Sequence, residues 1–382
     1  MKRYALMVVF FMLFGLREGN VFANQFTSID TEGTHAIQSD EYGSASSYFA
    51  VMSSTKDITV NVDGGAGILK FGNAGIPVTG IGYYLNADDD TGAKGHLNFN
   101  GNLEVYALRA SSFWTPFQVN NNSGTQGASI TVNGAIKAEL NNIQQSSGSV
   151  QTLMITAMDG GHFIANGNID LSGSAISQNG NASNYAIFVD PNVNVGTSIT
   201  TKADLGNDMN DIINIHNITV KAAKTAENIG ITGYGYDKGI IANPDKYFIN
   251  VHGKASIDNL LAETSSSADS ALSVAVYAQY EGQINFFSDL KINNIAATGV
   301  NAEAYAIYAS DSGIINVNPN NDQNEIIQIE GNIIAIDDDG SYIDAAVNVN
   351  LTNADSYFLG ETASNGTASV NINLSNGAQW RT

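Results

Sequence analysis

A stretch of nine residues, 97–105, shows the pattern that organises the whole chain. Apolar residues stand at Leu97, Phe99, Leu103 and Val105, polar residues fill the gaps, and Gly101 takes the centre. Successive side chains of a strand point to opposite faces, so the alternation predicts a strand with one buried and one solvated face. A glycine inside such a run indicates a bend or the close approach of another backbone.

The same pattern returns along the chain, and each copy has a small or turn-forming residue at its centre. The centres are Gly64, Gly101, Gly134, Gly167, Gly253, Ser288, Gly331 and Asn376. Most neighbouring centres lie 33 to 45 residues apart, and a degraded copy with shifted parity surrounds residues 213–217. Repeats of this length are typical of solenoids and propellers, whose units must stack to bury their apolar stripe. Chance alternation in a β-sandwich, the alternative, does not explain the shared centre.

A second recurring element combines alanine with large residues between the nine-residue runs. It occurs at residues 106–108, 185–187, 276–278 and 305–308. Small and large neighbours suit a strand on a curved, crowded surface, so each unit is predicted to hold three or more short strands. Whether a unit makes one long coil or two short ones stays open. Residues 221–228 fit a helical turn or a loop, and without helices between the strands a βαβ sheet is excluded.

The turn-rich segments vary in length while the strands do not, which is typical of loops that project from a regular scaffold. These segments are 86–95, 120–127, 173–184, 263–268, 318–324 and 337–340. No linker rich in proline, glycine and serine divides the chain, so we expect one domain over residues 24–382. Residues 24–62 follow the pattern poorly and are predicted to form an atypical N-terminal cap with the first coils.

Residues 1–23 have the features of a secretory signal peptide. Lys2 and Arg3 precede an apolar run over residues 4–16, and Ala23 ends a small-residue cleavage site. The run is too short for an ordinary transmembrane helix, and no later segment approaches 18 apolar residues, so no membrane-spanning helix is expected in the mature chain. A buried N-terminal helix is the weaker alternative.

Composition narrows the class of partner. The formal net charge is −21, the sequence pI is about 4.3, and no stripe of basic residues occurs. This charge disfavours nucleic acid and anionic membrane surfaces as partners, so neither is predicted. The chain has no cysteine, so thiol catalysis is excluded and stability must come from stacking instead of disulfides.

Few residues suggest chemistry. The histidines are His35, His96, His162, His216 and His252, and two aspartate runs, 88–90 and 337–339, could in principle attract calcium. The histidines are far apart in sequence, no acidic pair at coil spacing stands out, and neither aspartate run has the spacing of a calcium loop. Solvated surface residues are therefore the favoured interpretation. No catalytic, cofactor-binding or metal-binding residue is predicted, and no ligand-binding residue can be assigned.

The residues also resemble a known family. The leader, the acidic repeats rich in glycine, asparagine and serine, the absence of cysteine, and the ending 370–380 with its Asn-Gly-Ala-Gln-Trp sequence are similar to the passenger region of a pertactin-like bacterial autotransporter. The resemblance implies an all-β fold, a right-handed parallel β-helix on the outer surface of a Gram-negative bacterium. With coils of about 20–25 residues, the chain would make about 14–18 rungs spaced about 4.8 Å apart.

The chain departs from that family because no C-terminal translocator barrel follows Thr382. The function expected from the resemblance is non-enzymatic adhesion or surface display, with a protein or glycan on a host cell or extracellular surface as the partner. Export by the signal peptide would lead to the cell surface or, without a translocator, to the periplasm. The alternatives are a secreted carbohydrate-active β-helix enzyme, either a polysaccharide lyase or a hydrolase, and a truncated passenger remnant without function.

Overall fold

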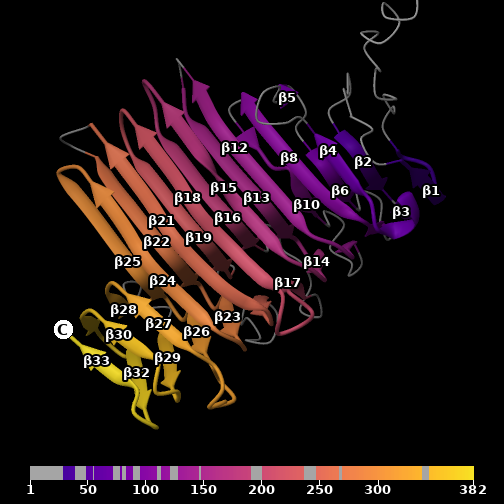
Figure 1. Ribbon diagram of the computed structural model, residues 1–382. Coiled ribbons are helices and arrows are strands. Elements are labelled where there is room, and N and C mark those ends of the chain that lie inside the picture. Colours follow the sequence, from indigo (N-terminus) through magenta and orange to yellow (C-terminus); the bar gives the residue numbers. More distant parts are fainter. Residues whose placement is uncertain are drawn as a thin grey trace, which may run out of the picture.

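The computed structural model describes residues 29–38, 49–54, 56–71, 78–79, 83–88, 95–109, 113–120, 128–145, 148–190, 200–235, 247–265, 269–337 and 344–382. These residues form three long parallel sheets that wind around one core, which confirms the predicted all-β parallel β-helix (Figure 1). The chain passes from sheet 1 to sheet 2 to sheet 3 in each coil. The coils stack from the indigo N-terminal strands to the yellow C-terminal strands.

In the described part of the chain, sheet 1 has eleven strands in sequence order. They are β1 (Gly33–Ile37), β3 (Asp57–Val62), β7 (His96–Asn100), β11 (Ser129–Val132), β14 (His162–Ala165), β17 (Thr201–Leu205), β20 (Tyr247–Val251), β23 (Gln283–Phe286), β26 (Ile314–Val317), β29 (Ala346–Leu351) and β32 (Ser369–Leu374).

From β3 onward, each described strand of sheet 1 is followed by a corner and a strand of sheet 2. The 3₁₀ turn η1 (Asp63–Gly65) lies at the corner before β4, and the short strand β5 pairs with β8. The strands of sheet 2 are β4 (Ile68–Phe71), β5 (Val78–Thr79), β8 (Asn102–Arg109), β12 (Ile136–Gln145), β15 (Ile169–Ser177), β18 (Ile212–Ala222), β21 (Lys254–Thr264), β24 (Leu290–Thr298), β27 (Ile327–Glu330), β30 (Tyr357–Leu359) and β33 (Gln379–Arg381).

Sheet 3 closes each coil, and β9 pairs beside β13. Its strands are β2 (Phe49–Ser54), β6 (Tyr83–Asp88), β9 (Phe113–Trp114), β10 (Phe117–Val119), β13 (Val150–Met158), β16 (Ala182–Asp190), β19 (Ala226–Tyr234), β22 (Ser270–Gln279), β25 (Asn301–Ser310), β28 (Ile333–Ile336) and β31 (Thr362–Ser364).

The nine-residue run is two short strands that meet at the corner between sheets 1 and 2. Leu97 and Phe99 point inward from β7, Leu103 and Val105 point inward from β8, and all four are buried. Gly101 between them has a positive φ of 140°, which glycine adopts readily. The expected bend and close backbone approach are both confirmed.

The packing of successive coils leaves no room for a side chain at the corner glycines. A Cβ atom on Gly134 would lie 2.1 Å from the carbonyl oxygen of Gly101 in the coil before, and one on Gly167 would lie 2.8 Å from that of Gly134. These three glycines mark the same corner of successive coils. One repeat is therefore one coil of three strands, which decides between the two coil lengths that the sequence leaves open.

The expected coil of about 20–25 residues, with about 14–18 rungs, is wrong. Sheet 1 contains 11 strands, which at about 4.8 Å per strand gives a stack about 50 Å long. The coils are longer than the resemblance implies because each one holds three strands with connections of uneven length. The degraded copy lies in β18, after the long corner from Leu205 to Ile212, and its parity changes at Asn217, which has a φ of 52°.

Two other expectations from the repeat need correction. The copy centred on Gly331, residues 327–335, forms β27 and β28 and so turns the corner between sheets 2 and 3, not the corner between sheets 1 and 2 that Gly101 marks. The alanine-containing element at 106–108 lies in β8 of sheet 2, whereas the other three copies lie in sheet 3. Residues 221–228 contain no helix: residues 221–222 end β18, residues 226–228 begin β19, and only residues 223–225 form the connection.

Several expectations concern residues that the structure does not describe. The signal peptide over residues 1–23 and the mature start at Asn24 lie outside the described residues. Within the expected cap, β1, β2 and β3 are already strands of the sheets. In the described part of the chain, no helix is long and apolar enough to cross a membrane.

Candidate functional site

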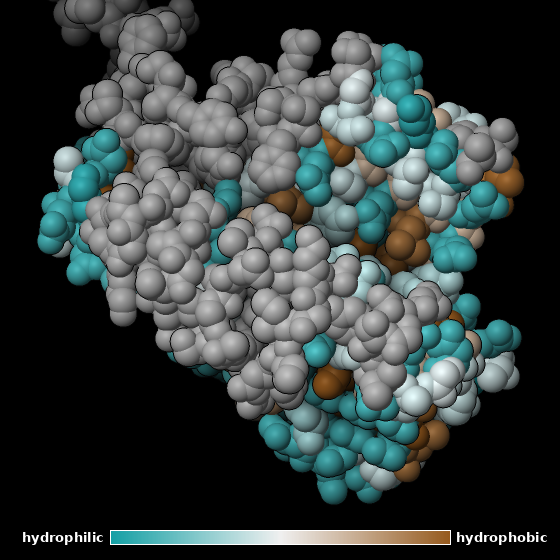
Figure 2. Space-filling view, turned by 180° about the vertical axis from the view of Figure 1, so that it is seen from behind, coloured by the Kyte–Doolittle hydropathy of each residue, from teal (hydrophilic) through white to brown (hydrophobic). Residues whose placement is uncertain are grey.

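The outward side chains of the three sheets are the groups available for chemistry, because the inward ones fill a closed core of aliphatic and phenylalanine residues. On the face shown in Figure 2, hydrophilic residues predominate over the described part of the surface, and hydrophobic ones form small separate patches. A candidate site must therefore be sought among columns of outward residues, where strands one coil apart bring side chains together.

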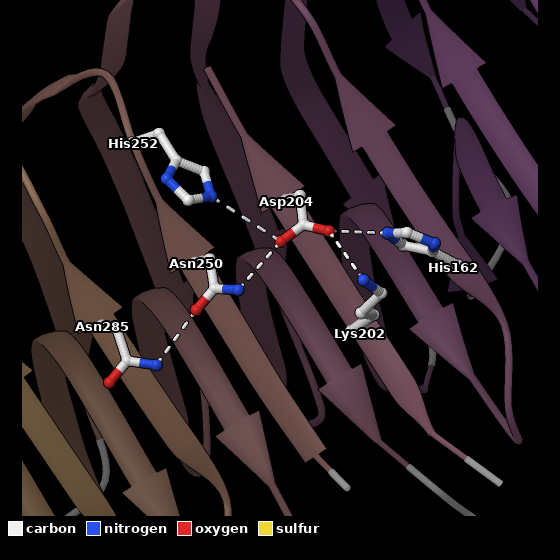
Figure 3. A network of polar contacts seen from close by, with 6 residues as sticks. All are labelled: His162, Lys202, Asp204, Asn250, His252 and Asn285. Atoms are coloured by element: carbon white, nitrogen blue, oxygen red, sulfur yellow. Dashed lines mark hydrogen bonds and ion pairs between the residues drawn. The ribbon is translucent and has the colours of Figure 1, made fainter. Parts of the chain in front are cut away.

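The densest polar cluster lies on sheet 1 around Asp204. Lys202 and Asp204 point outward from β17, while Ala203 between them and Leu205 after them are buried. His162 Nε2 on the preceding strand lies 2.7 Å from Asp204 Oδ2, and Lys202 Nζ lies 3.1 Å from the same oxygen (Figure 3). Asn250 on the following strand donates to Asp204 Oδ1 at 2.9 Å, and His252 Nε2 lies 3.8 Å from it.

Asp204 is the end of an asparagine ladder that runs along sheet 1. Asn250, Asn285, Asn316, Asn348 and Asn371 stand in register, and each donates from Nδ2 to the Oδ1 of the residue one coil before at 2.9–3.0 Å. A carboxylate only accepts hydrogen bonds, so Asn250 must turn its amino group toward Asp204. That single constraint orients every amide of the ladder in the same direction.

Neighbouring side chains keep the Asp204 carboxylate ionised and occupy most of its hydrogen-bond acceptor sites. Burial alone would raise the pKa of this carboxyl, but hydrogen bonds from His162, Asn250 and Lys202 and the Lys202 charge hold the pKa far below its usual range. Its two oxygens already accept from three side chains and face His252 as well. Little acceptor capacity remains for a metal or substrate, so the cluster chiefly fixes the ladder.

Some histidines lie close to the same acidic residue, although their spacing in the sequence suggested that they would lie far apart. His162 and His252 both face Asp204, because the strands β14 and β20 are the two neighbours of β17, one coil before and one coil after it. His216 pairs with Asp170 at 2.7 Å, and His96 bonds to the Ser129 hydroxyl at 2.7 Å. Within the described ranges, no three histidine, aspartate or glutamate side chains stand close enough to hold a metal ion.

The aspartate runs are only partly described. Asp337 accepts hydrogen bonds from the backbone of Asp344 and Ala345 and from the Thr367 hydroxyl, so its carboxylate is fully engaged in local contacts. Asp88 ends β6. Residues 89–90 and 338–340 lie outside the described residues.

No acidic pair at coil spacing stands out in the sequence, but Asp159 and Asp190 form one at the corner between sheets 3 and 1. The Asp159 N–H donates to the Asp190 carbonyl oxygen at 3.2 Å. Burial, and to a lesser extent the charge of Asp159, raise the pKa of the Asp190 side chain to about 7. This carboxyl can therefore hold or release a proton near neutral pH.

A second acidic pair, Asp289 and Glu325, lies at the corner between sheets 1 and 2. Glu325 is buried and accepts from the Ser288 hydroxyl at 3.0 Å. Burial raises the pKa of Glu325, the Ser288 bond lowers it, and the hydrogen bond and charge of Asp289 raise it further. Both pairs escaped sequence reasoning because the lengths of the connections hide which carboxylates share a corner.

Sheet 3 carries a different outer face, which we call the aromatic surface. Its seven rings are Tyr185, Phe188, Tyr234, Tyr277, Tyr280, Tyr305 and Tyr308, on or directly after β16, β19, β22 and β25. Tyr277 and Tyr308 stack with centroids 4.9 Å apart, and Tyr185, Phe188 and Tyr234 form a chain of contacts at 5.3 and 6.4 Å. All seven rings are half-buried.

Apolar and acidic side chains support the aromatic surface. Leu153, Ile229 and Val274 stand in register with Tyr185 and are buried although they lie apart from the main core. The Tyr185 hydroxyl donates to Glu227 Oε2 at 2.5 Å. Burial raises the pKa of Glu227, and the Tyr185 bond partly opposes it, while burial and the nearby Glu303 raise the pKa of Tyr305 to about 12.

Comparison of the chain with protein-family models, with curated proteins and with solved structures finds no match in any of the three. Function must therefore be argued from the geometry of these faces.

Proposed function

We propose that this chain is a non-enzymatic, exported β-helical rod that binds a partner on a host cell or extracellular surface, as an autotransporter passenger does. The observation that carries the proposal is the aromatic surface of sheet 3. It extends over four neighbouring strands, and its rings are fixed against one another and against a buried apolar layer.

The scaffold supports this role because it is continuous. Every strand of sheets 1, 2 and 3 is hydrogen-bonded to a strand of the coil before or after it. Stacked coils of this kind form an extended, stiff body whose faces repeat at the spacing of strands. A partner can therefore contact several coils at once, and binding does not carry the entropy cost of ordering a flexible segment.

The aromatic surface supports binding because of the residue types it gathers. Tyrosine offers a large contact area and a polar hydroxyl and loses little conformational entropy on binding, and it is enriched at energetically important positions of interfaces. Here the rings are already held by neighbours, such as Tyr305 against Tyr308 at 5.2 Å. The surface is thus organised before any partner arrives.

Export is the part of the proposal that rests on the sequence. The expected signal peptide over residues 1–23, the net charge of −21 and the absence of cysteine suit a secreted chain that gains stability from stacking. Cell fractionation of the producing bacterium, with an antibody against the protein, tests it. Recovery in the cytoplasm would contradict it.

Binding is tested with fluorescently labelled protein on epithelial cells, measured by flow cytometry. The double variant Tyr277→Ala/Tyr308→Ala removes the stacked pair and is expected to bind at least tenfold more weakly. Tyr357→Ala is the matched control, because Tyr357 lies on β30 of sheet 2, bonded to Glu330 and near Arg381, away from the aromatic surface. Equal binding by both folded variants and the unchanged protein would contradict the proposal.

A second candidate function, a carbohydrate-active enzyme, is favoured by one observation. Asp190, with a pKa of about 7 beside Asp159, is an acid with the proton affinity that general acid–base catalysis requires. Incubation with neutral and uronic-acid polysaccharides, followed by an assay for new reducing ends and unsaturated products, tests it. Cleavage that disappears in Asp190→Asn would replace the proposed function, whereas no cleavage leaves the binding rod as the better account.

A further inference from the structure

Sheet 2 contains a bend that divides three neighbouring long strands. Asn217 in β18, Asn259 in β21 and Asn294 in β24 have φ values of 52°, 55° and 54°. The inward side chains change parity at this point, for example from Ile215 to Ile218 in β18. Asparagine adopts this left-handed conformation more readily than most residues with a side chain, so its presence at all three positions fits the backbone.

The bend is held from inside the coil. Asn228 of β19 is buried and donates from Nδ2 to the carbonyl oxygens of Ile218 at 2.8 Å and Leu261 at 3.2 Å. Ser273 of β22, also buried, donates to the carbonyl oxygen of Leu260 at 3.2 Å. Because these bonds satisfy carbonyls beside the bend, the outward amides of the three asparagines are not all required to hold it.

On the outside, the bend encloses a groove. Its volume is about 540 Å³, within the range of small-molecule sites. Leu260, Leu261, Ile295 and Ala296 line it together with Thr219 and the three asparagines, and polar and apolar surface contribute about equally. The asparagines are exposed, and Asn259 donates to Asn217 Oδ1 at 3.2 Å. The groove therefore combines apolar floor atoms with a row of amides.

The groove has no charged side chain among its lining residues. The nearest carboxylate, Asp258, accepts from Asn259 at 3.0 Å and from Asn294 at 2.9 Å. His216 lies between Asp170, at 2.7 Å, and Asn217, at 2.7 Å. Beyond Thr219 and Leu261, Lys221 pairs with Glu263 at 2.7 Å. These neighbouring charges are paired or bonded, so the groove favours an uncharged ligand.

The spacing of the amides indicates a ligand with a repeat. The three asparagines stand one coil apart on adjacent strands, about 4.8 Å from one to the next. One hexose unit in a linear chain has a similar length, and a carboxamide can both donate to and accept from a hydroxyl. We propose that this groove binds a neutral, linear oligosaccharide, whose successive hexoses lie against successive asparagines along the axis of the coil. The site is on a different sheet from the aromatic surface and does not depend on the proposed function.

The test is isothermal titration calorimetry of the purified full chain with three probes. Cellopentaose and maltopentaose are neutral hexose chains, and pentagalacturonic acid is an anionic one of the same length. The variant Ala296→Phe fills the groove from an exposed position, and Asn259→Gly removes one amide while keeping a residue that accepts a positive φ. Asn321→Gly is the matched control, because Asn321 is exposed with a φ of 54° and lies outside the groove.

We expect at least one neutral pentasaccharide to bind, and Ala296→Phe and Asn259→Gly each to weaken its affinity at least tenfold with an unchanged melting temperature. Asn321→Gly should bind like the unchanged chain. The proposal is overturned if neither neutral chain binds, if pentagalacturonic acid binds at least as tightly as both, or if the groove variants bind normally. Loss of epithelial-cell binding in the Tyr277→Ala/Tyr308→Ala variant, with pentasaccharide binding intact, would separate this site from the aromatic surface.

Discussion

The outer faces of sheets 1 and 3 are built on the same strand spacing but present opposite chemistry. On sheet 1, asparagines in register satisfy one another, and the ladder ends on a carboxylate that three side chains hold charged. On sheet 3, half-buried rings cover an apolar layer, and nearby carboxyls such as Glu227 and Asp190 have raised pKa values. Polar groups that satisfy one another stabilise a fold, whereas apolar rings and poorly solvated acids at a surface are features of binding and catalytic sites.

The largest expected effect on stability is at Asp190, at the end of a sheet 3 strand. Its pKa is about 7 in the folded chain and about 3.9 in an unfolded one, so folding takes up a proton between these values. Its contribution is therefore fully present below about pH 4 and is lost as the pH rises through about 7. Asp190→Asn should raise the free energy of unfolding at pH 8 by about 2–4 kcal/mol, measured by urea denaturation.

The control for Asp190→Asn is the free energy of unfolding of both chains, measured over a series of pH values. The unchanged chain should lose stability from pH 4 to pH 7 relative to Asp190→Asn, and the two curves should run parallel above pH 8. Parallel curves over the whole range would show that the Asp190 carboxyl titrates normally. The difference in pKa that we assign to the acids of sheets 1 and 3 would then be contradicted.

The next largest effect is at Asp204 on sheet 1, with the opposite sign. A carboxyl with a lowered pKa contributes stability above its unfolded pKa of about 3.9, and that contribution is lost as the pH falls toward the folded value. Asp204→Asn removes the acceptor of His162 and Lys202 and should cost about 2 kcal/mol at pH 7. Urea denaturation should show this difference shrinking below pH 4, and a constant difference would contradict the assigned charge state.

A smaller effect is expected within the ladder. Asn316→Ala removes one donor to Asn285, which is buried but still accepts from Gln283 at 3.0 Å. It also removes one acceptor for Asn348, which is half-buried, so that water can replace part of the loss. The expected cost is about 1 kcal/mol in the free energy of unfolding. Asn320→Ala is a useful control because Asn320 is exposed in the connection between β26 and β27. Equal, near-zero effects of both changes would show that the ladder does not stabilise the fold.

The strands and the first corner could be predicted from the sequence because both depend on local rules. Alternation identified the inward residues of β7 and β8, and Gly101 marked their corner. The pattern failed where a connection lengthens, as between Val317 and Ile327, because the corner residue is then no longer at the centre of a nine-residue run. The coil length taken from the family resemblance was also wrong, because connections of uneven length make most coils longer than the resemblance implies.

The candidate sites were harder to predict because they depend on which coils become neighbours. His162, Asp204 and His252 meet only because each lies near the same position of successive coils. Asp159 and Asp190 could have been paired by aligning Met158 with Asp190 once the coil length was known. The bend at Asn217 left one visible trace, the shifted parity around residues 213–217, since a left-handed residue within a strand turns the following side chains to the other face.

The most direct test of the account compares sheets 1 and 3 in one assay of binding to epithelial cells. Asn316→Ala changes the ladder of sheet 1, and Tyr277→Ala/Tyr308→Ala changes the aromatic surface of sheet 3. The account predicts that the sheet 1 variant binds like the unchanged chain and the sheet 3 variant binds at least tenfold more weakly, both with intact β-sheet circular dichroism. Equal binding by the two variants, or a loss confined to the sheet 1 variant, would contradict it.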